Sequence, residues 1–439
     1  MSEFAYPVEL PIEPLTKPPL ATVSVPGSKS ITNRALVLAA LGSRTAATVL
    51  TGALQSEDTE VMVECLRRLG FRVTTDWPRA RIVVGRSGSD RMIPATEADL
   101  FVGNSGTSVR FLAAMLGLGQ GRYRLDGIPR MRERPIQDLL DALAQLGVKS
   151  TCERGTGCPP VLIETEGWHG NHVVVRGDVS SQFLSALLLA APFAGKPIEI
   201  ETTGPLVSEP YIAMSVRMVE QWGGVVRRTT ARHGYLVEGF VSAPPAEYAI
   251  EPDASSASYF AALPAIAGGT ITLNDMPQPG TALQGDVEFL SVLERMGCDV
   301  VWSGRAVTIR GGPLRGVDVD MNAISDTVMT LAVVALFAEG PTTIRNVAHI
   351  RHKETDRIAA VATELRKLGA VVEERDDGLT IRPRPLTGCA VDTYNDHRMA
   401  MSLSLVGLKI PGVVIRNPGC VAKTYPGFWR DLEKLRGEP

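Results

Sequence analysis

Residues 330–346 read TLAVVALFAEGPTTIRN, which is an apolar run of helical length, then a glycine, then a short run rich in Thr and Ile. The same phrase begins again at residues 35, 111, 185, 259 and 402. Its marker glycines, from Gly42 to Gly412, are 71 to 79 residues apart. A period this constant indicates six copies of one supersecondary module.

A second phrase alternates with the first and consists of a leucine-rich helix end, a glycine and a strand, as in LERMGCDVV and LRKLGAVVE. Each period therefore holds two helices, and we predict that each ends at a glycine C-cap before a strand. Helices of the first kind are apolar all round and should be buried, whereas those of the second kind are amphipathic. If the copies divide equally, an α/β protein with three buried helices per domain results. The glycines of the second phrase are Gly70, Gly147, Gly223, Gly297 and Gly369.

The composition restricts the class of protein. A chain of 439 residues favours two domains of roughly 200 residues each. Lysine and arginine number 45 against 48 acidic residues, and only 5% of residues are aromatic, so we expect no nucleic-acid partner. Six cysteines without a CxxC pair, no apolar leader and no apolar run of about 18 residues indicate a cytoplasmic enzyme with reduced thiols and no membrane span.

A polar start signal precedes each buried helix: GSKSITN, GNSGTS, GDVSSQ, PDASSA, AISDT and YNDHR. Helix N-capping accounts for any one of these segments taken singly. It does not account for the basic residues in or beside them. Several helix N-termini reinforced by Lys and Arg would form a site for a ligand with several negative charges. These basic residues are Lys29, Arg34, Arg110, Arg130, Arg351, Lys353, Arg357, Arg398 and Lys423.

The stretch VPGSKSITNR at 25–34 lacks the glycine spacing of a nucleotide P-loop, so a nucleotide phosphate is not indicated. In GIPRMRERP at 127–135 we expect the turn to hold Arg130 still, whereas Arg132 and Arg134 have a solvated turn as an equal alternative. His349 and His352 stand among cations, which disfavours a metal ion, and none is expected.

The stretch HIRHKETDR at 349–357 supports two interpretations. Lys353, Glu354 and Arg357 have the i, i+1, i+4 spacing of a helix, so the acid could exchange protons among cations, or the three could form a surface ion-pair helix. Asp326 is either an N-cap or a catalytic carboxylate. His397 and Arg398 are likewise either part of a helix start or catalytic residues.

Nine motifs together resemble the 3-phosphoshikimate 1-carboxyvinyltransferase (5-enolpyruvylshikimate-3-phosphate synthase) family: PGSKSITNRAL, GNSGTSVRFL, PRMRERP, GDVSSQFLSALLLAAP, PDASSASYF, the Asp of ISDTVMT, KETDR, YNDHRMAM and CVAKTYP. They follow the family's order from Pro26 to Pro426. The resemblance implies a two-domain inside-out α/β barrel of six βαβαββ repeats, three per domain. Residues 1–27 and 250–439 would form the first domain and 28–249 the second, with the active site in the cleft between them.

The reaction implied by the resemblance moves the enolpyruvyl group of phosphoenolpyruvate to the 5-hydroxyl of shikimate 3-phosphate and releases phosphate. Asp326 and Glu354 would exchange the protons, Lys29 would assist phosphate departure, and His397 would orient or relay. No cofactor or metal is implied, and a monomer is expected because the repeats bury one another. The implied ligands of shikimate 3-phosphate are Lys29, Ser30, Arg34, Ser180, Ser181, Gln182, Ser208, Tyr211, Asp326 and Lys353. Those of phosphoenolpyruvate are Lys29, Asn104, Gly106, Arg130, Gln182, Arg357, Arg398 and Lys423.

Two positions depart from the family's common pattern: His349 stands where many members have Asn, and Phe111 where many have Pro. The second departure suggests altered sensitivity to phosphoenolpyruvate mimics such as glyphosate, which comparison of the wild type with Phe111→Pro would test. One rival is the sister enolpyruvyltransferase acting on UDP-N-acetylglucosamine, but PRMRERP lacks that family's loop cysteine. Another is a silent polyanion-binding module, in which Asp326 and Glu354 would be dispensable.

Overall fold

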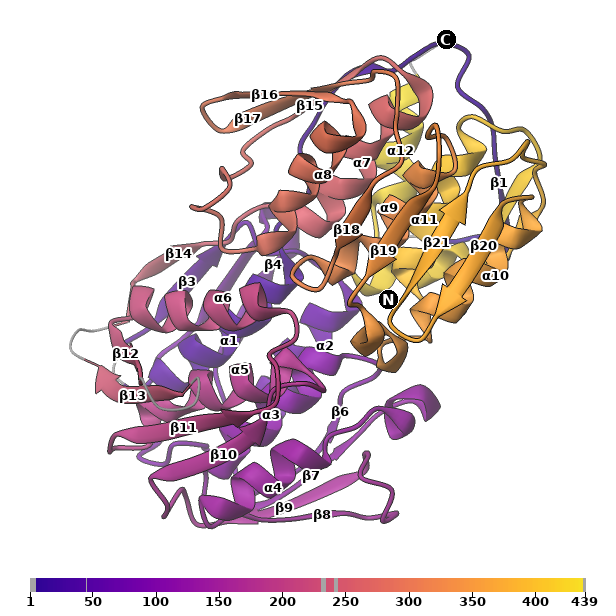
Figure 1. Cartoon of the computed structure of the whole chain (residues 1–439). Helices are drawn as coiled ribbons and strands as arrows, with labels where there is room; N and C mark the ends of the chain where they lie inside the picture. The colour runs from indigo at the N-terminus through magenta and orange to yellow at the C-terminus, as the bar shows by residue number, and fades with distance from the viewer. Residues whose placement is uncertain (1–4, 45, 230–233, 241–243, 437–439) are drawn as a thin grey trace. The chain divides into compact units, whose positions relative to one another are not determined.

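The structure is a computed structural model that describes residues 5–44, 46–229, 234–240 and 244–436. The chain forms two compact units. One unit is Gly27–Ile250, and the other combines Met1–Pro26 with Glu251–Pro439 (Figure 1). The second unit is therefore discontinuous in sequence, because the first is inserted into it.

The Gly27–Ile250 unit contains three four-stranded sheets and six α-helices. Its sheets run in the orders β14-β3-β5-β4, β6-β7-β9-β8 and β10-β11-β13-β12. The strands are β3 Thr48–Thr51, β4 Val73–Asp76, β5 Arg81–Val84, β6 Glu97–Phe101, β7 Gly121–Asp126, β8 Lys149–Cys152, β9 Val161–Thr165, β10 His172–Arg176, β11 Ile198–Thr203, β12 Gly224–Arg228, β13 Tyr235–Phe240 and β14 Glu247–Ala249. The helices are α1 Lys29–Gly42, α2 Glu57–Arg68, α3 Gly106–Gly117, α4 Gln137–Gln145, α5 Ser181–Ala190 and α6 Glu209–Gln221.

The other unit contains two four-stranded sheets, β16-β17-β15-β2 and β18-β19-β21-β20, and one three-stranded sheet, β1-β23-β22. Its strands are β1 Glu9–Ile12, β2 Leu20–Val23, β15 Thr270–Leu273, β16 Asp299–Ser303, β17 Ala306–Arg310, β18 Asp318–Asp320, β19 Thr342–Arg345, β20 Val371–Arg375, β21 Gly378–Arg382, β22 Ala390–Val391 and β23 Val413–Arg416. Its helices are α7 Ala254–Ala267, α8 Phe289–Met296, α9 Val328–Ala335, α10 Arg357–Lys367, α11 His397–Gly407 and α12 Phe428–Glu433.

One βαβαββ pattern generates these sheets. In the copy β6-α3-β7-α4-β8-β9, the first two strands are parallel, and β9 then inserts antiparallel between β7 and β8. The sixth copy departs from the pattern, because no strand follows β23 in the described residues up to 436. Strand β1, from the other end of the chain, pairs antiparallel with β23 and takes the vacant place.

The leading strands of two copies are exchanged between the units. Strand β2 precedes α1 in sequence but pairs parallel with β15, in the copy that contains α7. Strand β14 precedes α7 but pairs parallel with β3, in the copy that contains α1. The chain thus passes from one unit to the other twice, each time between a leading strand and the helix that follows it.

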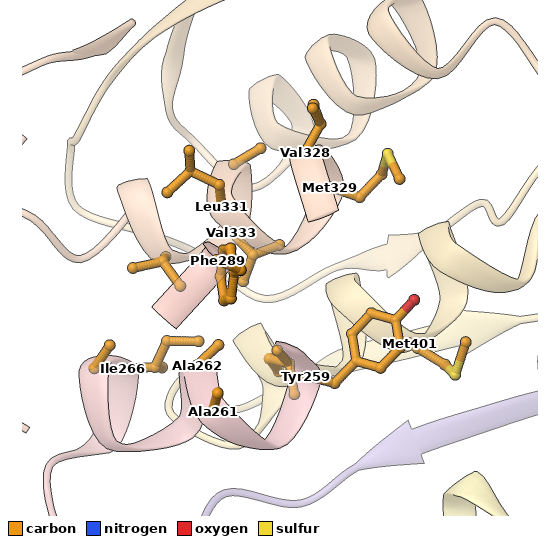
Figure 2. Packing of buried hydrophobic residues seen from close by; sticks show 14 of the residues in the cluster. Tyr259, Ala261, Ala262, Ile266, Phe289, Val328, Met329, Leu331, Val333 and Met401 are labelled. Carbon is orange, nitrogen blue, oxygen red and sulfur yellow. The ribbon is translucent and has the colours of Figure 1, made fainter. Parts of the chain in front are cut away.

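Three helices occupy the centre of each unit, as the repeat predicts. Every residue of α1, α3, α9 and α11 is buried, and α5 and α7 each keep only one residue that is not. Figure 2 shows Ala262 and Ile266 of α7 on the side of that helix that faces Phe289 of α8, and the ring of Tyr259 pointing toward Met401 of α11. The prediction of buried central helices is therefore confirmed.

The repeat is also visible inside the second unit as a chain of hydroxyl groups. The Oγ of Ser258 on α7 lies 3.1 Å from Oγ1 of Thr330 on α9, which lies 3.3 Å from Oγ of Ser402 on α11. Successive members are separated by 72 residues. Equivalent positions of three copies thus meet where the central helices cross.

The expectation that a glycine C-cap ends each helix is wrong for the first helix type, because among the six buried helices only α7 has a glycine, Gly268, at its C-cap. It is confirmed for the second helix type. Gly70, Gly147, Gly223, Gly297 and Gly369 all have positive φ, between 87° and 113°. Only glycine adopts such a backbone without strain, which explains why this residue ends each amphipathic helix. In the part of the chain that the structure describes, no helix is long and apolar enough to cross a membrane.

Candidate active site

The Gly27–Ile250 unit gathers the first turns of its three central helices. Asn33 of α1 donates to Oγ1 of Thr107 on α3 at 2.9 Å, and Arg110 of α3 donates to Oε1 of Gln182 on α5 at 2.9 Å. Helix N-termini carry partial positive charge, so the grouping favours anions. The polar start signals seen in the sequence are thereby brought together within this unit.

Lys29 is the first residue of α1, and its Nζ lies 2.5 Å from Oδ2 of Asp58. Both side chains are buried. Asp58 was not predicted as a site residue. Acidic residues are common in the first turn of a helix, where the helix dipole stabilises their charge, so its position in α2 does not indicate a special role. The buried partner keeps Lys29 charged and holds it at the helix end.

Arg34 of α1 is buried and makes several hydrogen bonds within the Gly27–Ile250 unit. It is 1% exposed, and its guanidinium donates to Oγ of Ser215 at 2.8 Å and to the carbonyl oxygens of Ser30 and Tyr211 at 3.0 and 3.2 Å. The centre of the Phe111 ring lies 5.0 Å from Cζ of Arg34. Burial lowers the pKa of Arg34 to about 10. Arg34 therefore connects α1 to α6.

Two arginines surround Gly106, the first residue of α3. A Cβ added there would lie 2.4 Å from Nη2 of Arg134 and 2.8 Å from Nη1 of Arg110. Arg134 also donates to the carbonyl oxygen of Asn104 at 2.9 Å. Only 5% of Arg134 is exposed, so the solvated-turn interpretation is wrong for this residue. The sequence alone could not predict this burial, because the turn contains several arginines and the local pattern does not distinguish the buried one from the exposed ones.

The remaining predicted ligands of this unit lie at helix starts and in a loop. Ser180 is the N-cap of α5 and accepts from the backbone N–H of Gln182, so the capping interpretation holds for it. Ser181 and Tyr211 are buried in the first turns of α5 and α6. Ser208 precedes α6 with a left-handed φ of 50°. Arg130 pairs with Glu133 at 2.8 Å in a 3₁₀ turn, while Arg132 pairs with Asp126.

The other unit contains a buried group of acids and bases, which we name the carboxylate–cation cluster. Asp326 lies in the 3₁₀ turn Ser325–Thr327 before α9. Its Oδ1 accepts from Lys353 at 2.5 Å and Arg357 at 3.1 Å, and its Oδ2 accepts from Arg398 at 2.7 Å. The N-cap alternative for Asp326 is therefore wrong, since Thr327 occupies the cap position. The members of the cluster are Asp326, Lys353, Glu354, Arg357, Asp396, Arg398 and Lys423.

Arg357 is the centre of this cluster. It is 1% exposed and donates to both carboxylate oxygens of Asp396, at 2.8 and 3.3 Å, and to Oε2 of Glu354 at 2.9 Å. Burial acts to lower the pKa of Arg357, but the carboxylates of Asp396, Glu354 and Asp326 raise it above its ordinary value. A planar guanidinium with five N–H groups suits this bridging, which lysine could not reproduce.

The charges around Asp326 keep it ionised. Burial alone would raise its pKa, but Arg398, Lys353 and Arg357 hold it well below the usual 3.8. Glu354 lies between Arg357 and Lys423, whose Nζ is 3.5 Å from its Oε1. The cluster therefore offers one buried carboxylate, Glu354, and one partly buried carboxylate, Asp326, and the oxygens of both already contact cations.

The helical spacing expected for Lys353, Glu354 and Arg357 is wrong. Lys353 ends the 3₁₀ turn Ala348–His352, and α10 begins only at Arg357, with Asp356 as its N-cap. Glu354 and Arg357 are buried, so the alternative of a surface ion-pair helix is wrong too. The break in the helix allows Glu354 and Lys353 to point to different partners.

His397 and Arg398 form the first turn of α11, and Asp396 is its N-cap. His397 is 1% exposed, with Nδ1 3.5 Å from Oδ1 of Asp396. Sequence reasoning missed the second role of Asp396, which accepts from Arg357 as well as capping the helix. Among the described residues, no three His, Cys, Asp or Glu side chains are grouped to hold a metal ion.

Comparison with known proteins gives a consistent result. A curated 3-phosphoshikimate 1-carboxyvinyltransferase from Trichormus variabilis is 46% identical over 429 residues, covering 97% of this chain and 99% of the relative. The chloroplastic 3-phosphoshikimate 1-carboxyvinyltransferase of Solanum lycopersicum is 45% identical over 445 residues, and the match covers 98% of this chain and 84% of that relative.

The fold has relatives among solved structures. EPSP synthase from Acinetobacter baumannii superposes with a TM-score of 0.78 at 24% identity, covering 97% of this chain and 98% of that one. The enolpyruvyl transferase NikO from Streptomyces tendae gives 0.75 at 20% identity, with 97% of both chains covered. The α/β fold class expected from the sequence is thereby confirmed. Together with a family model that matches residues 16–432, these relatives show that the chain belongs to the EPSP synthase (3-phosphoshikimate 1-carboxyvinyltransferase) family.

Proposed function

We propose that this protein transfers the enolpyruvyl group of phosphoenolpyruvate to the 5-hydroxyl of shikimate 3-phosphate and releases inorganic phosphate. Family membership supports the reaction class. The observation that carries the proposal is the carboxylate–cation cluster, in which Asp326 and Glu354 are paired with Lys353, Arg357, Arg398 and Lys423.

The addition step of the reaction needs two proton transfers, and the elimination step needs a third. The 5-hydroxyl loses a proton as it attacks C2 of phosphoenolpyruvate, while C3 gains one. The tetrahedral intermediate then expels phosphate, and C3 returns its proton. We assign the hydroxyl proton to Asp326, which is ionised and ready to accept, and the C3 proton to Glu354.

Glu354 must carry a proton before it can donate one. The positive charges of Arg357 and Lys423 beside it favour the ionised form. A bound phosphoenolpyruvate brings carboxylate and phosphate charges that would share these two cations. Ligand binding would thereby weaken their hold on Glu354 and make its protonated form accessible.

The predicted ligands divide by chemistry. Arginine forks match carboxylate and phosphate, so Arg130, Arg357 and Arg398 would hold phosphoenolpyruvate together with Lys29, Asn104, Gln182 and Lys423. Hydroxyl and amide groups suit the sugar acid, and we assign it to Ser30, Ser180, Ser181, Gln182, Ser208 and Tyr211, with Asp326, Lys29 and Lys353. Gly106 leaves space beside Arg110 and Arg134. Arg34 would join these groups as a ligand of shikimate 3-phosphate.

The decisive experiment measures phosphate release from phosphoenolpyruvate by the purified protein. Shikimate 3-phosphate and UDP-N-acetylglucosamine are supplied as acceptors in separate reactions without added metal. Release only with shikimate 3-phosphate supports the proposal, and release only with the sugar nucleotide would overturn it. Asp326→Ala and Glu354→Ala should still bind ligand but lose turnover, whereas full turnover by both would refute their roles.

A further inference from the structure

A histidine outside the assigned catalytic groups is connected to the carboxylate–cation cluster. His349 lies in the 3₁₀ turn Ala348–His352 and is 9% exposed. Its Nε2 is 3.0 Å from Oγ of Ser325, the fully buried residue that precedes Asp326. Nζ of Lys353 lies 3.4 Å from the same Oγ and 2.5 Å from Oδ1 of Asp326. A continuous chain therefore links His349, through Ser325 and Lys353, to Asp326.

The chemistry of these groups determines the direction of the hydrogen bonds. The ammonium of Lys353 has protons only to donate, so Oγ of Ser325 accepts from it. The single hydroxyl proton of Ser325 can then be donated to Nε2 of His349, 3.0 Å away, if that nitrogen presents its lone pair. In this arrangement the imidazole is neutral, with its proton on Nδ1.

The surroundings of His349 favour that neutral form. Burial, followed by the charge of Lys353, lowers the pKa of His349 to about 3, and Arg357 and His352 act in the same direction. Asp326 acts in the opposite direction but does not prevail. The imidazole is thus neutral near pH 7, and a neutral imidazole has one acceptor nitrogen.

We propose that His349 is a positioning residue: by accepting the proton of Ser325, it turns the Oγ lone pairs toward Lys353 and so holds the Lys353–Asp326 pair in place. The inference rests on the proposed function, in which Asp326 accepts the proton of the 5-hydroxyl. A lysine restrained at two points keeps Asp326 oriented, and small misplacements of catalytic groups lower rates strongly. His349 acts through Ser325 and needs no contact with substrate.

A double-mutant cycle tests this route. His349→Ala and Ser325→Ala should each lower kcat about tenfold to a hundredfold while KM for shikimate 3-phosphate changes little. The double variant should be no worse than the poorer single variant, within about twofold, because both remove the same connection. Additive losses, or an effect of His349→Ala on KM alone, would overturn the proposal. Thermal unfolding of all three variants identifies losses that come from misfolding.

Two further variants make the double-mutant cycle more specific for the hydrogen bond between His349 and Ser325. His349→Asn can still present an acceptor oxygen to Ser325, so it should recover most of the rate lost in His349→Ala. His352→Asn changes an exposed histidine of the same turn and should leave kcat unchanged. Failure of His349→Asn to exceed His349→Ala, or an equal loss from His352→Asn, would count against the assignment.

A spectroscopic measurement is independent of turnover. The chain has six histidines, and the 15N signals of His349 can be identified by their loss in His349→Asn. Near pH 7 these signals should show a neutral ring with the proton on Nδ1 and should shift in Ser325→Ala. A charged ring, or a proton on Nε2, would refute the proposal even if the enzymatic activity were confirmed. Absence of phosphate release from the wild type would instead refute the proposed function.

Discussion

Replacing Asp326 by Asn tests the catalytic role and the electrostatics of the cluster in one change. The amide has the size of the carboxylate but presents one oxygen and one NH₂ group. If its oxygen replaces Oδ1, the NH₂ faces Nη2 of Arg398, which now lies 2.7 Å from Oδ2. If its oxygen replaces Oδ2, the NH₂ faces Lys353 and Arg357, now at 2.5 and 3.1 Å. In either orientation, the N–H groups of the new amide face N–H groups of a cation, and neither side can accept a hydrogen bond.

The expected losses differ between catalysis and stability. Removing a general base lowers kcat about 10²- to 10⁴-fold, which corresponds to about 3–5.5 kcal/mol of activation free energy. Removing one partner of a buried ion pair destabilises a fold by about 3–5 kcal/mol. Because the Asp326 side chain is 14% exposed, we expect the lower end of that range for the free energy of unfolding.

Two assays on the same preparation separate these effects. Initial rates of phosphate release give kcat, and urea unfolding gives the free energy of unfolding. Asp376→Asn is the matched control, since Asp376 is an exposed acid of the same unit, and it should change neither quantity. A kcat of Asp326→Asn within tenfold of the wild type would refute the general-base role. An unchanged urea midpoint would refute the electrostatic argument.

Three further predictions follow from the geometry. The pKa of Asp326 is lowered in the folded state, so its contribution to stability is present above about pH 4 and lost as the pH falls below that value; urea midpoints should fall less steeply with acid in Asp326→Asn than in the wild type. Gly106→Ala should raise KM for phosphoenolpyruvate more than for shikimate 3-phosphate, since the new methyl group displaces Arg134; equal changes in steady-state kinetics would contradict this. Phe111→Ala should lower the free energy of unfolding by about 3–5 kcal/mol, because the ring is buried beneath Arg34, and a thermal midpoint unchanged from wild type would argue otherwise.

The sequence could predict the features that depend on local pattern. Six apolar helices of nearly constant period and the C-cap glycines such as Gly297 follow from periodicity and backbone preference, and both are found. The exchange of β2 and β14 leaves no local signal in the sequence, because each strand pairs with one about 200 to 250 residues away, and the domain bounds near residues 27 and 250 were expected only from the family resemblance. Asp58 and Arg134 were missed for a similar reason: a charged residue in a polar segment looks solvated until its distant partners are known.

The pairing of the first strands has a consequence for folding during synthesis. Strand β14 can join β3 as soon as it leaves the ribosome, which completes the sheets of the Gly27–Ile250 unit. Strand β1 must wait for β23, about 400 residues later, which takes roughly 20–80 s at about 5–20 residues per second. An unpaired strand left waiting can join other chains. Four prolines before Pro19, one of them Pro11 within β1, lack the N–H that such a misplaced pairing would use, and thereby protect the nascent chain.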